Sequence, residues 1–172
     1  SSRWGPALGL HKESKFTRLR RFPGSVMSQE DQGNGKWKDL VQSLIREVVS
    51  FPDMLFVMGK GPQAVMEGWV QSEKSRVSVE NDWIAVESEH WHCHLCLAEV
   101  VHIRFVEEAD PHDPKRQAYS LRFLAGDQAP LLMIFFGKMY DDSGLLIGEK
   151  ATRFHSLRQR YDRALATAPN LD

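Results

Sequence analysis

The fold is decided by the stretch Ala118-Tyr-Ser-Leu-Arg-Phe-Leu-Ala-Gly-Asp-Gln-Ala-Pro-Leu-Leu-Met-Ile-Phe-Phe-Gly-Lys138. Residues 118–124 and 131–136 are rich in aromatic and aliphatic side chains, which is typical of strands. The loop residues 125–129 between them contain glycine and aspartate, which favour a hairpin loop. The stretch therefore predicts two antiparallel strands, and the second is expected to be buried because residues 131–136 are entirely apolar.

Further short strands are predicted before this hairpin, with a helix at each end of the series. The strand-like runs are residues 54–58, 64–71, 76–79 and 83–86, then the histidine segment, which runs on from Trp83 through Leu97, and residues 100–106. Apolar side chains recur every three or four residues over 35–51 and again over 143–167, which predicts two amphipathic helices. Since no helix separates successive strands, this order predicts an α+β fold: an antiparallel β-sheet of many short strands flanked by an N-terminal and a C-terminal helix.

The length of 172 residues favours a single domain, which we place at residues 27–172. Residues 1–26 mix Gly, Pro, Ser and Arg without a sustained period. We therefore expect this segment to be a disordered tail, or sequence from upstream of a natural start at Met27. A targeting peptide is the alternative interpretation, because the segment is rich in Arg and Ser and poor in acids.

The charge distribution argues against nucleic acid as a partner of the folded part. Residues 1–26 carry six basic side chains and one acidic side chain, so the other residues carry 16 basic and 22 acidic side chains. An acidic body repels a phosphate backbone. No apolar run approaches the roughly 18 residues of a membrane span, so we also expect no membrane-spanning segment.

The candidate ligand residues lie in Glu89-His-Trp-His-Cys-His-Leu-Cys-Leu-Ala-Glu99. On a strand, side chains two positions apart share a face. His90, His92 and His94 would then line one side with Cys96, and Trp91 would lie on the other side with Cys93, Leu95 and Leu97. Such a row of imidazoles suits iron, another transition metal or heme, although a solvated polar face would have the same pattern.

The two cysteines, Cys93 and Cys96, are too few for a disulfide framework. Three positions apart on a strand, they would face opposite sides, so we expect neither a shared metal nor a redox role. His92 and His94, followed by Glu99, match the first half of the metal motif of cupin barrels. A cupin-like metalloenzyme is therefore one alternative function, but the glycine that follows the glutamate in cupins is missing here.

The hairpin stretch 118–138, together with Arg153-Phe-His-Ser-Leu157 and Cys93-His-Leu-Cys-Leu-Ala-Glu-Val-Val-His-Ile103, resembles the HutX/ChuX-type heme-utilisation carriers, which are related to the HemS-like heme-trafficking proteins. The resemblance covers about residues 35–165. It implies non-covalent binding and carriage of heme in the cytoplasm by a homodimer that meets heme donor or acceptor proteins. In this resemblance His94 falls on the strand histidine that the family uses near heme, so His94 is the expected ligand of the heme iron.

Other residues are assigned to the site through this resemblance. The family's second histidine would fall near Met58–Lys60, where this chain has none. His90 or His92 would substitute as ligand or line the pocket. Trp91 or Phe136 would cover the macrocycle, and a cation would pair with the heme propionates; the candidate cations are Lys60, Arg104 and Lys138. A heme-degrading oxygenase, and a module that has lost ligand binding, remain alternatives to a carrier.

Overall fold

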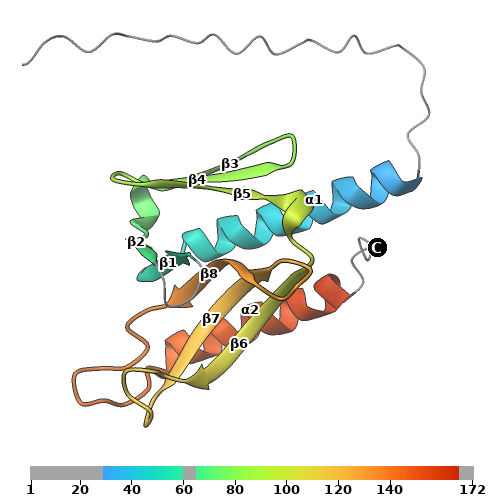
Figure 1. Ribbon diagram of the computed structural model, residues 1–172. Helices are drawn as coiled ribbons and strands as arrows, with labels where there is room; N and C mark the ends of the chain where they lie inside the picture. The colour runs from blue at the N-terminus through green and yellow to red at the C-terminus, as the bar shows by residue number, and fades with distance from the viewer. Residues whose placement is uncertain (1–28, 60–64, 167–172) are drawn as a thin grey trace, which may run out of the picture.

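The computed structural model describes residues 29–59 and 65–166 (Figure 1), so the predictions for residues 1–26 and for Lys60 lie outside the described part. The helices are α1 (Gln29–Val49) and α2 (Gly148–Ala166), with short 3-10 helices η2 (Ser72–Lys74) and η3 (Leu97–Glu99). The strands are β1 (Met54–Met58), β2 (Met66–Trp69), β3 (Arg76–Glu80), β4 (Trp83–Glu87), β5 (His92–Cys96), β6 (His102–Ala109), β7 (Gln117–Leu124) and β8 (Pro130–Phe136).

The described strands form two antiparallel sheets instead of one. Strands β2-β1-β8-β7-β6 form a five-stranded sheet, and strands β3-β4-β5 form a three-stranded sheet. The predicted α+β class and the two terminal helices are confirmed, and every strand pair is antiparallel. The predicted hairpin is β7–β8, and its loop is closed by the Ala125 N–H, which donates to the Ala129 carbonyl at 2.9 Å.

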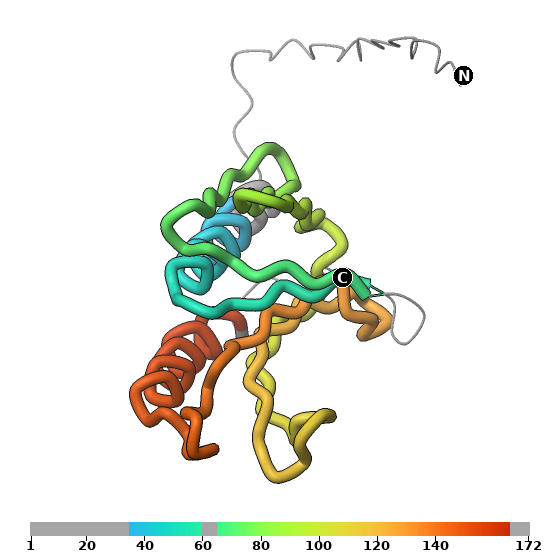
Figure 2. Tube along the Cα trace, turned by 90° about the vertical axis from the view of Figure 1, so that its left-hand side faces the viewer, coloured from blue at the N-terminus to red at the C-terminus, as the bar shows by residue number. Residues whose placement is uncertain are grey.

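Both helices lie on the same side of the five-stranded sheet (Figures 1 and 2). Helix α1 runs between the two sheets, whereas α2 packs on the lower part of the five-stranded sheet. Phe154 of α2 is fully buried, with ring centroids 4.9 Å from Phe136 and 5.7 Å from Phe105. The other face of the five-stranded sheet carries no helix in the described part of the chain, and we call it the open face.

The helix boundaries differ from the prediction for local reasons. Helix α1 ends at Val49, two residues before the predicted end, and the Pro52 ring disfavours helical geometry at the residue before it. Helix α2 begins at Gly148 and not at Ser143, because Asp141 organises a turn first. The Asp141 carboxylate accepts hydrogen bonds from the backbone N–H groups of Ser143 and Leu145, both at 2.9 Å.

The predicted strand at residues 83–86 is confirmed as β4, but its expected continuation through Leu97 is wrong, because the chain reverses direction between β4 and β5. The polar residues Ser88 to His90 form the turn, and the Ser88 N–H donates to the Trp91 carbonyl at 2.8 Å. The reversal pairs the two halves of the run with each other. It also removes His90 from the strand, so only His92 and His94 share a strand face.

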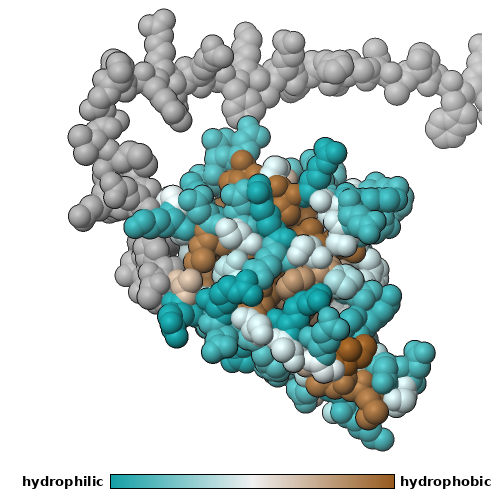
Figure 3. Space-filling view, turned by 180° about the vertical axis from the view of Figure 1, so that it is seen from behind, coloured by the Kyte–Doolittle hydropathy of each residue, from teal (hydrophilic) through white to brown (hydrophobic). Residues whose placement is uncertain are grey.

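Seen from behind, the surface is largely hydrophilic with smaller hydrophobic areas between (Figure 3). Neither helix in the described part is long and apolar enough to cross a membrane.

Candidate functional site

Strand β5 presents alternate side chains to water and to the core, as the sequence predicts. His92 and His94 are exposed, whereas Cys93 and Leu95 are buried, and Leu97 is buried just beyond the strand end. The apolar residues set this orientation, since they fill the space between the three-stranded sheet and α1. The imidazoles are therefore held outward by the burial of their sequence neighbours.

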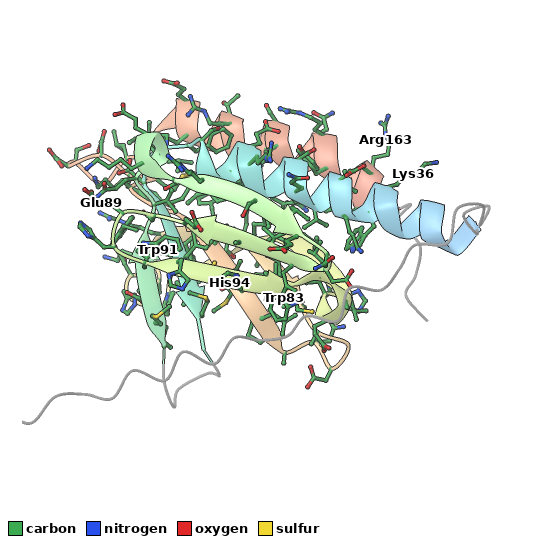
Figure 4. All side chains as sticks on the ribbon, turned by 90° about the horizontal axis from the view of Figure 1, so that it is seen from above. Lys36, Trp83, Glu89, Trp91, His94 and Arg163 are labelled. Atoms are coloured by element: carbon green, nitrogen blue, oxygen red, sulfur yellow. The ribbon has the colours of Figure 1, made fainter. Side chains whose placement is uncertain are left out.

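The outer side of the three-stranded sheet forms a surface that we call the histidine face, which includes His92, His94, Glu87, Ala85 and Trp83. Glu87 is directly opposite His92 in the strand register. Figure 4 labels His94 and Trp83 on this sheet. Ala85 lies directly opposite His94 in the strand register, so the neighbour of this imidazole is small. Trp83 is opposite Cys96 and is 48% exposed. The rings of His92 and His94 meet edge to face, with centroids 5.4 Å apart.

The His94 side chain makes no hydrogen bond or ion pair with any residue that the structure describes, and its ring lies edge to face with that of His92. One nitrogen of a neutral imidazole carries no proton and has a lone pair. Without a hydrogen-bond partner in the protein, this lone pair can be donated to a bound metal ion. The exposed position of His94 leaves that lone pair accessible from solvent.

His90 lies in the β4–β5 turn, beside a small acidic and basic cluster. Its Nε2 atom is 3.6 Å from a Glu89 carboxylate oxygen, and the same carboxylate accepts a hydrogen bond from the Lys74 Nζ at 2.6 Å. The turn borders a shallow hollow of about 370 Å³ that His90, Trp91 and His92 help to line. His90 is thus near the histidine pair without continuing its row.

Trp91 points to the opposite side of the chain from the histidines. Its ring packs against Phe56 of the five-stranded sheet with centroids 5.2 Å apart, and its Nε1–H donates to the Trp69 carbonyl at 3.0 Å. Gly68 allows this approach, because a Cβ atom there would lie 2.7 Å from the indole ring. The structure therefore brings Trp91 into the junction between the two sheets and not beside His94.

The two cysteines face opposite sides of β5, as the sequence predicts. Cys93 is only 5% exposed, and its burial raises the pKa of the thiol to about 11, against a smaller lowering effect of a backbone hydrogen bond from Val86. Cys96 is half-buried on the outer side, and both cysteines are free. A thiol with a raised pKa is a poor nucleophile and a poor metal ligand at neutral pH.

The other expected site residues lie around the open face of the five-stranded sheet. Phe136 and Lys138 border a groove of about 460 Å³, whose floor is formed by apolar side chains of β1 and β8. The residues that line this groove include none from β5. Lys138 is 2.8 Å from Asp53, and Arg104 is exposed on β6. The structure thus separates these residues from His94: Phe136 and Arg104 lie in the five-stranded sheet, and Lys138 follows β8 directly.

Within residues 29–59 and 65–166, no group of three or more His, Cys, Asp or Glu side chains is arranged to hold a metal ion. His92 and His94 share a face, but Glu99 lies on the exposed side of η3 after the strand has ended. The geometry therefore gives the cupin-like alternative no support.

A model of ChuX/HemS-like proteins matches residues 42–163, which is more than half of the chain. The chain belongs to this family of heme-utilisation proteins. No curated protein matches the chain in sequence.

Solved structures share the fold at low sequence identity. A crystal structure of ChuX has a TM-score of 0.58 and 17% identity, and the match covers 76% of this chain and 74% of that chain. A structure described as the heme-binding protein ChuX has a TM-score of 0.56 and 16% identity, covering 70% and 72% of the two chains. Holo-PhuS, a heme-binding protein from Pseudomonas aeruginosa, has a TM-score of 0.54 and 11% identity, and the match covers 70% of this chain and 32% of PhuS.

Two neighbours of the histidines escaped the sequence prediction. Ala85 lies opposite His94 and Trp83 lies opposite Cys96 only through the β4–β5 register, which the sequence prediction did not contain. The signal was present in the polar run Glu87-Ser-Glu-His90, which is suited to a turn between two strands.

Proposed function

We propose that this protein binds heme non-covalently and carries it, with His94 as the ligand of the heme iron. In this proposal residues 27–172 act as one heme-binding domain, in the cytoplasm and as a homodimer. The protein would receive heme from a donor protein and release it to an acceptor. Membership of a heme-utilisation family supports this role.

The observation that carries the proposal is the state of His94. It is an exposed imidazole on a paired strand, fixed from below by buried Cys93 and Leu95, and its ring lies edge to face with that of His92. A heme iron accepts such a nitrogen as an axial ligand. Since the core residues hold the strand, the imidazole is positioned before any ligand arrives.

The residues around His94 fit the chemistry of a heme. Ala85 leaves space beside the imidazole, and the half-exposed indole of Trp83 offers an apolar surface on the neighbouring strand. His92 supplies a second imidazole on the same face. When bound, the heme would contribute an iron that accepts an imidazole nitrogen, and these residues would orient it on the sheet.

The open position of His94 favours carriage over catalysis. Most small-molecule sites are concave and bury most of their ligand. A site with one strong ligand on an open sheet face holds heme by a bond that a competing imidazole can replace. We therefore expect exchange with an acceptor protein to be fast relative to release into water.

The test is a titration of the purified full chain with hemin, followed by the Soret absorption. The wild-type chain should give a saturable, red-shifted Soret band at one heme per chain. His94→Ala should weaken binding by at least tenfold and remove the spectral signature of imidazole ligation. His92→Ala should weaken binding by a smaller factor, because this residue assists and does not ligate in the proposal.

The matched control is His112→Ala, which removes an exposed histidine from the loop between β6 and β7. It should leave the titration unchanged. Hemin binding that persists unchanged in His94→Ala would contradict the proposal, and so would tight binding of one zinc ion per chain with no binding of hemin.

A further inference from the structure

The histidine face carries two imidazoles at a spacing that allows both to bind one ion. His92 and His94 are two positions apart on β5, so their side chains leave the same face of the strand. Their ring centroids are 5.4 Å apart, and the ring planes meet at 81°. Both side chains are exposed, and neither makes a hydrogen bond or ion pair with a residue that the structure describes. The pair is therefore open to a ligand that binds both rings at once.

The separation of the two rings fits a tetrahedral ion. Zinc binds an imidazole nitrogen at about 2.0 to 2.1 Å, and the ring centre lies about 1 Å further away, so two rings on one tetrahedral zinc have centroids about 5 Å apart. The observed 5.4 Å is close to this value. Two rings at a right angle on a square-planar ion would be nearer, with centroids about 4.5 Å apart. Rotation about the side-chain bonds of His92 and His94 thus suffices to aim one nitrogen of each ring at a tetrahedral ion.

A carboxylate stands beside the imidazole pair. Glu87 lies directly opposite His92 in the β4–β5 register, and both residues line the hollow at the β4–β5 turn. Glu87 is exposed and has no ion pair with any residue in the described part of the chain. A histidine that binds a metal commonly donates its other N–H to a carboxylate, which orients the ring and makes it a better ligand. Glu87 is positioned to support His92 in this way.

The charge of the histidine face also favours a cation. The strand registers place one basic side chain, Arg76, and two acidic side chains, Glu80 and Glu87, on this face of β3 and β4. With neutral imidazoles, the face therefore carries a net negative charge. Such a surface raises the local concentration of divalent cations.

We propose that the histidine face binds one zinc ion through the imidazole nitrogens of His92 and His94, with Glu87 accepting the other N–H of His92 and water completing the coordination. Two protein ligands agree with the lack of a three-ligand cluster among the described residues. Structural zinc sites use four protein ligands and hold the ion permanently. An ion held by two imidazoles is exchangeable, and the fold does not depend on it.

The zinc site shares His94 with the proposed heme site. A neutral imidazole has one unprotonated nitrogen, whose lone pair binds one metal at a time. Zinc on the imidazole pair therefore excludes the heme iron from His94 and lowers the heme loading of the protein. This regulatory step rests on the proposed function of His94, whereas the zinc site itself does not.

Calorimetric titration of the heme-free full chain with Zn²⁺ tests the site. The wild-type chain should bind one zinc ion with a micromolar dissociation constant. His92→Ala and His94→Ala should each weaken binding by at least tenfold, because a single imidazole cannot chelate. Glu87→Gln, which keeps the size of the side chain and removes its charge, should weaken binding by about threefold. A chain that binds no zinc, or binds it equally well in both histidine variants, overturns the inference.

The matched control is His112→Ala, which removes an exposed histidine outside this face and should leave zinc binding unchanged. Far-ultraviolet circular dichroism checks that each variant is folded.

Hemin titrations with and without Zn²⁺ test the competition. Saturating zinc should weaken hemin binding to the wild-type chain by at least tenfold. The same zinc concentration should have no effect on His92→Ala, which keeps His94 and lacks the chelate. Hemin binding to the wild-type chain that ignores bound zinc overturns the shared use of His94. Zinc binding that depends on both histidines, in a chain that binds no hemin, would reject the proposed heme role alone.

Discussion

The two sheets of this protein each have one buried face and one uncovered face, and the uncovered faces differ in kind. The histidine face of the three-stranded sheet is polar, with two exposed imidazoles opposite Glu87 and Ala85. The open face of the five-stranded sheet is apolar in the middle and charged at its two sides. The first arrangement suits a small ligand held by a coordinate bond, whereas the second offers an apolar contact area between two charged sides.

This comparison also shows how the buried faces allow the difference. Both sheets obtain their stability from the layer that contains α1 and α2, where the core residues cluster. The uncovered faces are therefore not needed to hold either sheet together. Their residues remain available for binding.

The largest expected effect tests whether the face of the five-stranded sheet that packs against α2 contributes most to the stability of the fold. Phe154→Ala removes a fully buried ring that contacts Phe105, Tyr119 and Phe136, and should lower the free energy of unfolding by about 3 to 5 kcal/mol. Phe135→Ala, on the open face, should cost only about 1 to 2 kcal/mol in dilute, monomeric protein. Urea denaturation measures both. Equal losses in the free energy of unfolding for the two variants would contradict the view that only the face against α2 is needed for stability.

The next effect concerns the junction that joins the two sheets. In Gly68→Ala the new methyl group would meet the Trp91 ring at 2.7 Å, and this ring is held by Phe56 and by its bond to the Trp69 carbonyl. We expect a loss of about 1 to 3 kcal/mol from overpacking. Chemical denaturation of the single variant measures this loss.

A double-mutant cycle separates this clash from other causes. Trp91→Leu removes the ring, so adding Gly68→Ala to that variant should cost much less than it costs in the wild-type chain. An unchanged cost in the double variant would show that the two sheets are not joined through Trp91.

The smallest effect lies at the edge of the five-stranded sheet, where Asp53 binds two lysines. Hydrogen bonds from Lys138 lower the pKa of Asp53 most, burial opposes this, and Lys150 lowers the pKa further. The folded state therefore holds the carboxylate ionised to a lower pH than the unfolded chain does. The stabilisation is complete above the ordinary pKa of 3.8 and is lost as the pH falls through the lower folded value.

Asp53→Asn should remove this pH dependence with little change elsewhere. Asp53 has a φ of 61°, a conformation that asparagine also tolerates, so the backbone should not be strained. Wild type and variant should differ by about 1 kcal/mol or less at pH 7 and should converge near pH 3. Unfolding curves at several pH values test this, and a constant difference at all pH values would contradict the ion-pair explanation.

Much of the fold was predictable from local patterns. The β7–β8 hairpin and strand β1 were predicted within one residue, because turn residues and apolar runs are strong local signals. The outward direction of His92 and His94 followed from the alternation of β5. The reversal at Ser88–His90 was missed, because the alternation of residues 90–96 was extended back through the polar run Glu87-Ser-Glu-His90, which suits a turn.

The sequence by itself determined the α+β class, the faces of β5 and the separation of Cys93 from Cys96, because these depend on periods of two and of three to four residues. Only the tertiary structure decided that the strands form two sheets, that Trp91 joins them, and that Glu87 lies opposite His92. Those facts depend on strand register and on which faces the helices cover. Such contacts join residues distant in sequence, so no local pattern records them.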